Sequence, residues 1–226
     1  MFDHLLWLGV TIALYAVCRA WHLRRPVWWN HPQMLGWLGL LAILLIGHVS
    51  YARYSRGAAP LVWLLGPSVV AFAVPIYDQR ALIRRYAAVL GVAVIIASLA
   101  SMALSWGLAT WLMLSPDMRL SLLPRSVSAP FSMIIAAHLG GTPGLAASFT
   151  ALSGLFGAAI GAGLVRFWRI RTPFAQGVMM GMGAHGIGTA RAFGWGVEQG
   201  TVAAATMMLA GLTNVMMVVI WRASIG

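Results

Sequence analysis

One segment in the last quarter of the chain combines strong apolarity with residue types that can bind a ligand. It reads Gly181-Met182-Gly183-Ala184-His185-Gly186-Ile187-Gly188-Thr189-Ala190-Arg191. In hydrocarbon every backbone polar group must be paired internally, so glycine-rich backbone persists only where protein or a wet cavity surrounds it. An ionisable side chain at membrane depth is costly enough to be a functional candidate by default. The sequence therefore predicts a substrate site here.

His185 and Thr189 are the candidate contacts within this segment, because residues four apart share one face of a helix. His185 could bond a carboxylate or carry a proton during a transport cycle. The alternative is a structural histidine bonded to a neighbouring carbonyl, and the surrounding glycines favour the functional interpretation. Arg191 has two open interpretations, a second anion contact or an interfacial anchor.

A second polar stretch, Leu122 to Pro130, places Arg125, Ser126 and Ser128 between two prolines. A half-helix that begins inside the membrane presents unpaired N–H groups and a positive dipole end, which suit a carboxylate. The planar guanidinium of Arg125 adds a fork that matches a carboxylate. An interfacial arginine reaching for lipid headgroups beside a helix-capping serine is the open alternative.

A third candidate is the stretch Gly66-Pro67-Ser68, which is followed by Pro75 and Asp78. Proline inside a helix removes a backbone donor and clashes with the preceding turn, so Leu61 to Tyr77 should be kinked or broken. Unwound backbone could offer carbonyls or N–H groups to a ligand. We expect Asp78 itself to be a loop residue.

The elements that position these residues are membrane helices. The chain is 61% hydrophobic, its mean hydropathy is +0.85, and its 226 residues include only 15 Lys and Arg and 4 Asp and Glu. Several stretches reach the roughly 18 apolar residues that a membrane crossing needs. We therefore expect an all-α integral membrane protein with a single domain over residues 1–226 and about seven segments. The predicted spans are Leu5 to Ala20, Gln33 to Val49, Leu61 to Tyr77, Tyr86 to Leu114, Gly144 to Val165 and Thr201 to Trp221.

The arginines set the expected topology. All fifteen basic residues are arginine and most lie in short loops, which is typical of orientation by cytoplasmic positive charge. The net charge of +11 therefore does not indicate nucleic-acid binding, which would gather basic residues on one stripe. With the N-terminus outside, the excess of arginines on the inner side is largest if Leu120 to His138 is a re-entrant hairpin. That topology puts nine arginines inside and three outside.

By the same logic, Thr172 to Trp195 should dip from the opposite face. Two broken elements that enter from opposite faces predict an inverted repeat with a site at the midplane. A short similarity between Leu64-Leu65-Gly66-Pro67-Ser68-Val69 and Leu122-Leu123-Pro124-Arg125-Ser126-Val127 is weak support for this repeat.

The sequence lacks the signatures of several other classes of protein. The sequence has no zinc-protease, nucleophile-elbow or phosphate-loop motif, and its four acidic residues all lie near predicted helix ends. Cys18 is the single cysteine, so it forms no disulfide within the chain. We expect neither an enzyme nor a metal or cofactor site. Glycines from Gly154 to Gly163 would let helices pack closely and make a homodimer plausible.

The chain resembles the LrgB family, which is also called the CidB or YohK-like family. The resemblance spans nearly the whole length. It is carried by Leu64-Leu65-Gly66-Pro67-Ser68-Val69-Val70-Ala71-Phe72-Ala73-Val74-Pro75-Ile76-Tyr77, Leu123-Pro124-Arg125-Ser126-Val127, Leu139-Gly140-Gly141-Thr142-Pro143, Arg169-Ile170-Arg171-Thr172 and the run His185 to Arg191.

The resemblance implies a bacterial inner-membrane protein that works with a small LrgA-like or CidA-like partner. The family was first described as antiholin-like, controlling murein hydrolase export and lysis. Relatives are linked to transport of pyruvate, glycolate and glycerate. Departures from the family pattern are Arg125 where lysine is typical, Ser128-Ala129 in place of Thr-Thr, and Met182-Gly183-Ala184 in place of Thr-Ala-Ser, so the substrate could differ or bind less polarly.

These observations lead to one expected function and one alternative. We expect a transporter of small monocarboxylates embedded in the lipid bilayer, with proton coupling through His185 as an extension. Arg125, Ser126 and Ser128 would hold the carboxylate on one side, His185 and Thr189 on the other, and Gly66, Pro67 and Ser68 would complete the wall. The alternative is an antiholin-like pore or modulator of murein hydrolase activity and lysis.

Overall fold

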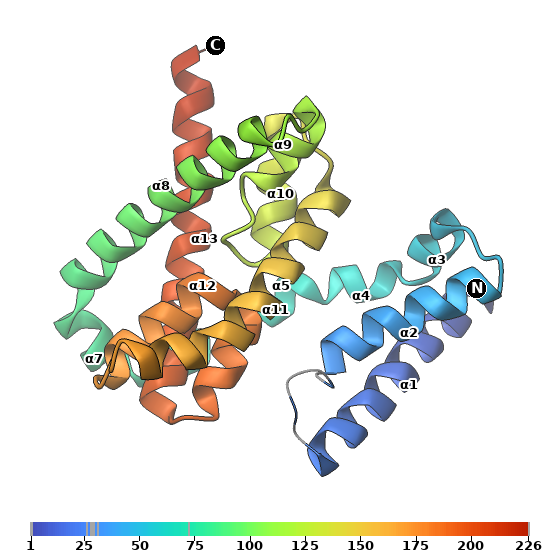
Figure 1. Cartoon of the computed structure of the whole chain (residues 1–226), viewed down its shortest axis with the longest axis horizontal. Coiled ribbons are helices and arrows are strands. Elements are labelled where there is room, and N and C mark those ends of the chain that lie inside the picture. The colour runs from blue at the N-terminus through green and yellow to red at the C-terminus, as the bar shows by residue number, and fades with distance from the viewer. Residues whose placement is uncertain (1, 26, 28–29, 31, 72, 226) are drawn as a thin grey trace. The chain divides into compact units, whose positions relative to one another are not determined.

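The computed structural model describes residues 2–25, 27, 30, 32–71 and 73–225 of the chain (Figure 1). The chain divides into two compact units, Met1–Val70 and Ala71–Gly226. Over the described residues the secondary structure is helical, with no strand. The two units are described separately, and the expectation of one domain over the whole chain stays a prediction.

The first unit is built on α1 (Phe2–Arg24) and α2 (Pro32–Ile46), which pack against each other. A short helix, α3 (Tyr51–Gly57), returns to the start of α1, where Arg53 forms a salt bridge with Asp3 at 2.9 Å. The ring of Trp7 meets that of Tyr54 edge to face, with 5.7 Å between centroids. These contacts tie α3 to the first turns of α1.

The predicted segment Leu61 to Tyr77 contains α4 (Ala59–Trp63), α5 (Leu65–Ala71) and α6 (Ala73–Asp78), and α7 (Arg80–Arg85) follows it. The described part of the segment is interrupted at Leu64, and the expected breaks at Gly66-Pro67 and Pro75 are wrong, since both prolines lie inside helices. Gly66 and Pro67 lie inside the first turn of α5. Proline is tolerated in a first turn, where its missing N–H has no intrahelical partner to lose. Asp78 ends α6 instead of lying in a loop.

The second unit contains three long helices with a shorter broken element between each pair. The long helices are α8 (Ala87–Trp111), α11 (Pro143–Phe167) and α13 (Val197–Ile225), and the shorter elements are α9 (Pro116–Leu122) with α10 (Ala129–Leu139) and α12 (Pro173–Phe193). Together with α1, the three long helices are long and apolar enough to cross a membrane. The protein is thus an all-α, multi-pass membrane protein, while the count of about seven segments stays a prediction.

Helices α9 and α10 form a helical hairpin, which we call hairpin 1. The backbone N–H of Thr142 donates to the hydroxyl of Ser121 at 2.8 Å, and the Thr142 hydroxyl donates to the carboxylate of Asp117 at 2.9 Å. The start of α9 and the end of α10 are therefore adjacent. The non-helical residues 123–128 lie at the closed end, which we call tip 1.

Helix α12 is a second hairpin, hairpin 2, because its backbone reverses at His185 (φ 48°, ψ −128°). A Cβ atom on Gly188 would collide with the carbonyl oxygen of Met180, eight residues earlier. In a straight helix those two residues would be roughly 12 Å apart. At the open end, Gln199 donates to the side chain of Gln176 at 3.4 Å. Residues 184–186 form the closed end, tip 2.

The two hairpins enter the second unit from opposite ends of α11. Hairpin 1 ends immediately before Pro143 and hairpin 2 begins shortly after Phe167, so their open ends flank a helix roughly 37 Å long. Figure 1 shows α9 and α10 toward one end of α13 and α12 at the other. This is the arrangement that two re-entrant segments from opposite faces require. Their insertion into a bilayer stays a prediction.

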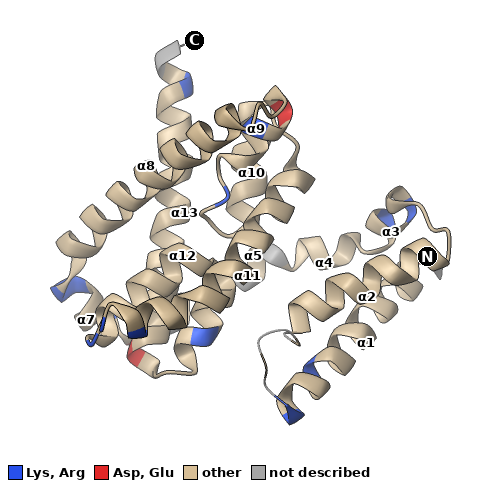
Figure 2. Ribbon diagram, in the orientation of Figure 1, with Lys and Arg blue, Asp and Glu red and all other residues tan. Residues whose placement is uncertain are grey.

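The arginines of the second unit agree with that arrangement. The rings of Tyr86 and Phe174 stack with 4.5 Å between centroids, which places the start of α8 beside the start of α12. Arg84 and Arg85 therefore lie at the same end as Arg171, and Figure 2 shows basic residues gathered there. If α9 and α10 crossed the unit completely, these groups would lie at opposite ends. Which face of the membrane this end occupies stays a prediction.

Helix α13 supports both hairpins. It packs along α12, α8 and α10, and the Asn214 amide donates to the Ser98 hydroxyl of α8 at 2.8 Å. Leu90, Val127 and Ile135 belong to one buried cluster and Ala158, Met180 and Ala203 to another. The short similarity proposed as a repeat trace has different backbones, helical at 65–71 and non-helical at 123–128, so the inverted repeat stays a prediction.

Candidate functional site

The two hairpin tips meet inside the second unit. His185 at tip 2 is 4% exposed, and Ser126 at tip 1 is 6% exposed. The imidazole of His185 lies close enough to the Ser126 backbone and to the charge of Arg125 to interact electrostatically with both. The structure therefore brings three of the predicted site residues together from segments that are sixty residues apart in sequence.

Arg125 is a half-buried cation held by a neutral partner. Its Nε donates to the hydroxyl of Ser105 on α8 at 2.9 Å, and that hydroxyl donates to the Ser101 carbonyl at 2.7 Å. Among the described residues, no carboxylate lies within salt-bridge distance of Arg125. A guanidinium has five N–H donors, so the two terminal nitrogens remain able to bind an anion.

Several buried polar atoms around the tips have no hydrogen-bond partner. They are the hydroxyls of Ser126, Ser128 and Thr150 and the Nε2 atom of His185. A polar atom left unpaired in a protein interior costs about 1–3 kcal/mol, so most such atoms have a protein, water or ligand partner. These unpaired atoms lie around the tips, where the terminal nitrogens of Arg125 can also bind an anion. Together they indicate a ligand site.

The helices that begin at the tips add positive potential. Ser128 is the N-cap of α10, but its side chain makes no capping bond. The second half of α12 begins directly after His185. The first N–H groups of each helix lack an intrahelical acceptor and carry the positive end of the dipole, which favours an anion.

Helix α11 closes the third side of the site. A Cβ atom on Gly154 would lie 3.4 Å from Nδ1 of His185 and 3.2 Å from the Ala184 carbonyl oxygen. Thr150 is one helical turn away from Gly154 on the same face of α11, which places its unpaired hydroxyl along the same wall. The glycine therefore seats tip 2 against the middle of α11.

Thr189 and Arg191 are engaged with protein atoms. The Thr189 hydroxyl donates to the His185 carbonyl at 2.8 Å and so stabilises the break that forms tip 2. Arg191 donates to the Ala158 carbonyl on α11 at 2.8 Å. A direct substrate contact by Thr189 stays a prediction. This bond joins hairpin 2 to α11, and the two interpretations of Arg191, a second anion contact or an interfacial anchor, stay predictions.

Gly66, Pro67 and Ser68 lie on α5 in the first unit, and the structure leaves their position relative to the tips undefined. The Ser68 side chain is outside the described part of the chain. Their predicted role as a wall of the site is therefore untested and stays a prediction.

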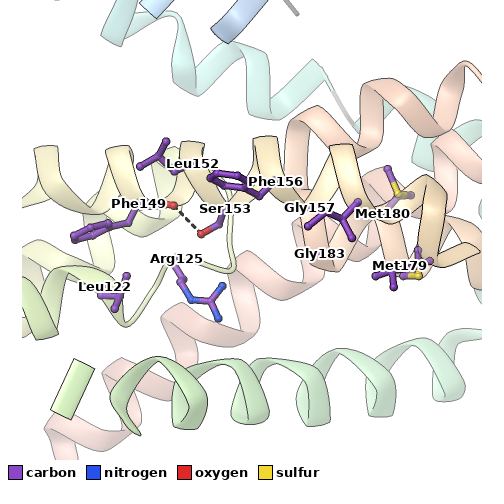
Figure 3. A pocket seen from close by; sticks show the side chains of 13 residues that line it. Leu122, Arg125, Phe149, Leu152, Ser153, Phe156, Gly157, Met179, Met180 and Gly183 are labelled. Atoms are coloured by element: carbon purple, nitrogen blue, oxygen red, sulfur yellow. Dashed lines mark hydrogen bonds between the residues drawn. The ribbon is translucent and has the colours of Figure 1, made fainter. Parts of the chain in front are cut away.

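A cavity of about 520 Å³ opens beside the tips, and thirteen of the described residues line it. Figure 3 shows Arg125 of tip 1 beside Ser153 of α11, with Met179 and Met180 of α12 further along. A Cβ atom on Gly157 would collide with the Gly183 carbonyl oxygen, so the backbones of α11 and hairpin 2 are in close contact there. The cavity gives Arg125 an open approach from one side.

Sequence reasoning missed Ser105, Thr150 and Ser153. Ser105 is one of three serines at helical spacing along α8, and Thr150 and Ser153 lie in an apolar span, so none of the three has a local signal. Among the described residues, no group of three or more His, Cys, Asp or Glu side chains is placed to hold a metal ion.

The fold and the unpaired polar atoms at its tips define a multi-pass membrane protein with a buried polar centre. The chain belongs to the LrgB-like family, whose model matches residues 11–223. It is 32% identical over 212 residues to the uncharacterized protein YwbG of Bacillus subtilis, covering 94% of each chain. It is 28% identical over 210 residues to the holin-like protein CidB of Staphylococcus aureus, covering 93% of this chain and 92% of that one. No solved structure matches it.

Proposed function

We propose that this protein transports small monocarboxylates of the pyruvate, glycolate and glycerate class across the bacterial inner membrane, together with an LrgA-like or CidA-like partner. Arg125 binds the carboxylate, Ser126, Ser128 and the helix N-termini of both tips surround it, and His185 contacts it from tip 2. Thr189 completes the site in this proposal. The N-terminus lies outside.

The observation that carries the proposal is the unpaired state of Arg125. A cation without a carboxylate partner, next to the unpaired Ser126 hydroxyl and His185 Nε2, matches the donors that a carboxylate needs. The surrounding wall is apolar, which excludes competing water and strengthens the interaction. A single cation also favours one negative charge over two.

Proton coupling through His185 extends the proposal. Histidine is the side chain whose protonation changes most readily between pH 5 and 8, and this one lies beside the proposed anion. A proton bound to His185 would offset the charge of the carboxylate while both move. An inward proton gradient should then accelerate uptake by the wild-type protein and leave the His185→Gln variant unaffected.

A second candidate function is a holin-like pore or a modulator of murein hydrolase activity and lysis. The names of the Staphylococcus relatives favour it. A pore conducts without a saturable site, so its flux rises linearly with concentration and analogues do not inhibit it. A carrier saturates and shows competition.

The test is uptake of labelled pyruvate, glycolate and lactate into proteoliposomes, with the protein alone and with its partner. The variants are Arg125→Gln and His185→Ala, and the control is Arg171→Gln, an exposed arginine at the open end of hairpin 2. Saturable uptake that both site variants abolish and the control retains is the expected result. Linear uptake that no variant changes would instead favour the pore.

A further inference from the structure

The cavity beside Arg125 is almost entirely apolar. Among the described residues that line it, the polar side chains are Arg125 and Ser153. The Ser153 hydroxyl already donates to the Phe149 carbonyl of its own helix at 2.7 Å. Beyond the guanidinium and the Ser153 oxygen, the side chains around a bound molecule are those of leucine, isoleucine, phenylalanine and methionine, as Figure 3 shows for most of them.

The cavity is also larger than a three-carbon acid requires. Its volume is about 520 Å³, and it is open on the side where Leu152, Phe156 and Ile160 are about half exposed. Hairpin 2 contributes Met179, Met180 and Gly183 to the lining, and none of these residues has a hydroxyl that could bond a polar substituent. The space next to the carboxylate-binding group therefore suits an apolar body.

We infer that the preferred substrates are monocarboxylates with an aliphatic or aromatic body of more than three carbons, and that hydroxylated short acids bind more weakly. This inference rests on the proposed function and specifies the substrate class of the same site. The carboxylate binds at Arg125 and the body occupies the space between α11 and hairpin 2. Each methylene buried there should raise affinity about fourfold.

Hydroxylated acids are disfavoured by the same geometry. A hydroxyl that leaves water for an apolar wall without a new partner loses free energy. The Ser153 hydroxyl donates to Phe149, so it can only accept from a substrate hydroxyl, and the second hydroxyl of glycerate finds no further polar side chain except Arg125 among the described lining residues. Glycerate should therefore compete less well than acids of equal or greater length that have no hydroxyl.

The experiment is inhibition of labelled pyruvate uptake by a graded series of unlabelled acids in proteoliposomes. The series contains glycerate, butyrate, 4-methylpentanoate, 3-phenylpropanoate and the long-chain acid palmitate. We expect 4-methylpentanoate and 3-phenylpropanoate to inhibit at concentrations at least tenfold lower than glycerate. The series uses the wild-type protein, so it does not depend on whether any variant folds.

A variant then tests whether the bulky acids inhibit by binding in this cavity. Ser153→Phe fills the cavity and should raise the inhibitory concentration of the two bulky acids at least tenfold relative to the KM for pyruvate measured in the same variant. Ser148→Phe is the matched control, because Ser148 is exposed on the same helix and also bonds the carbonyl four residues earlier, at 2.9 Å. The control should leave the whole series unchanged.

The outcomes separate this inference from the proposed function. Saturable pyruvate uptake that glycerate inhibits as well as the bulky acids do would overturn the inference and leave the transport function standing. Inhibition by palmitate alone would also overturn it and assign the cavity to lipid. The absence of any saturable uptake would overturn both this inference and the proposed transport function.

Discussion

Arg125 donates from Nε to the hydroxyl of Ser105 at 2.9 Å, so a serine of α8 orients the free cation of tip 1. The contact joins a regular helix to a non-helical segment. The two terminal guanidinium nitrogens make no hydrogen bond to the described residues. Because Ser105 is 1% exposed, it is too deeply buried to contact solvent freely.

We expect Ser105→Ala to weaken substrate binding while the protein stays folded. A hydrogen bond to a charged group contributes about 1.5–3 kcal/mol, so losing it should raise KM roughly tenfold or more as Arg125 loses its orientation. Ser101→Ala is the control, since Ser101 contributes a backbone carbonyl that alanine retains. Concentration-dependent uptake measures both variants, and an unchanged KM in Ser105→Ala would contradict the positioning role.

The backbone of His185 leads to a prediction about stability. Its φ of 48° with ψ of −128° lies in a region that glycine adopts and other residues avoid, at a cost of about 1–3 kcal/mol. His185→Gly should therefore be more stable than His185→Ala by about 1 kcal/mol, after allowing for the greater chain entropy of glycine. Neither should transport. Thermal unfolding in detergent measures the difference, and an alanine variant at least as stable as the glycine variant would argue against this backbone.

Gly157 is a point of backbone-to-backbone contact between α11 and hairpin 2. A Cβ atom there would collide with the Gly183 carbonyl oxygen, whereas a Cβ on Gly163 of the same helix would meet nothing within 4 Å. We expect Gly157→Ala to lower the free energy of unfolding by about 1–3 kcal/mol through overpacking. Gly163→Ala should be neutral or stabilising by up to about 1 kcal/mol. Equal stability of the two variants would refute the close approach.

Thr150 should bind substrate without contributing to folding. Its buried hydroxyl has no partner, so Thr150→Val removes an unsatisfied group and should leave stability unchanged or slightly raised. Substrate affinity should fall if the hydroxyl faces the ligand. Thr206→Val is the opposite control: that buried hydroxyl donates to the Val202 carbonyl at 2.7 Å, so its loss should cost stability and leave affinity intact. Unfolding and uptake measurements on both variants test this contrast. Any other combination of stability and affinity would contradict it.

Much of the fold could be predicted because its causes are local. The long apolar runs predicted α8, α11 and α13. The prolines did not locate the break within residues 61–77, which falls at Leu64. The bias of arginines toward one side predicted that α9 and α10 return to their starting end, which the contact between Asp117 and Thr142 now reflects in the structure.

The site was predictable only in part, because its residues come together only in the tertiary structure. Arg125, Ser126 and His185 stood out since polar residues among prolines and glycines are unusual in apolar sequence. The break itself could have fallen at any of the neighbouring glycines, which all tolerate positive φ, but it falls at His185. Ser105 has no distinguishing neighbour in sequence, since only the approach of tip 1 gives it a role.

The meeting of the tips at the middle of α11 has an electrical consequence. If the hairpins enter from opposite faces, the contact between Ser126 and His185 is the thinnest barrier between the two compartments, and much of the membrane potential falls across it. Moving one elementary charge through 100 mV corresponds to about 2.3 kcal/mol. An anion that crosses alone would therefore generate a current, whereas an anion that crosses with a proton on His185 would not.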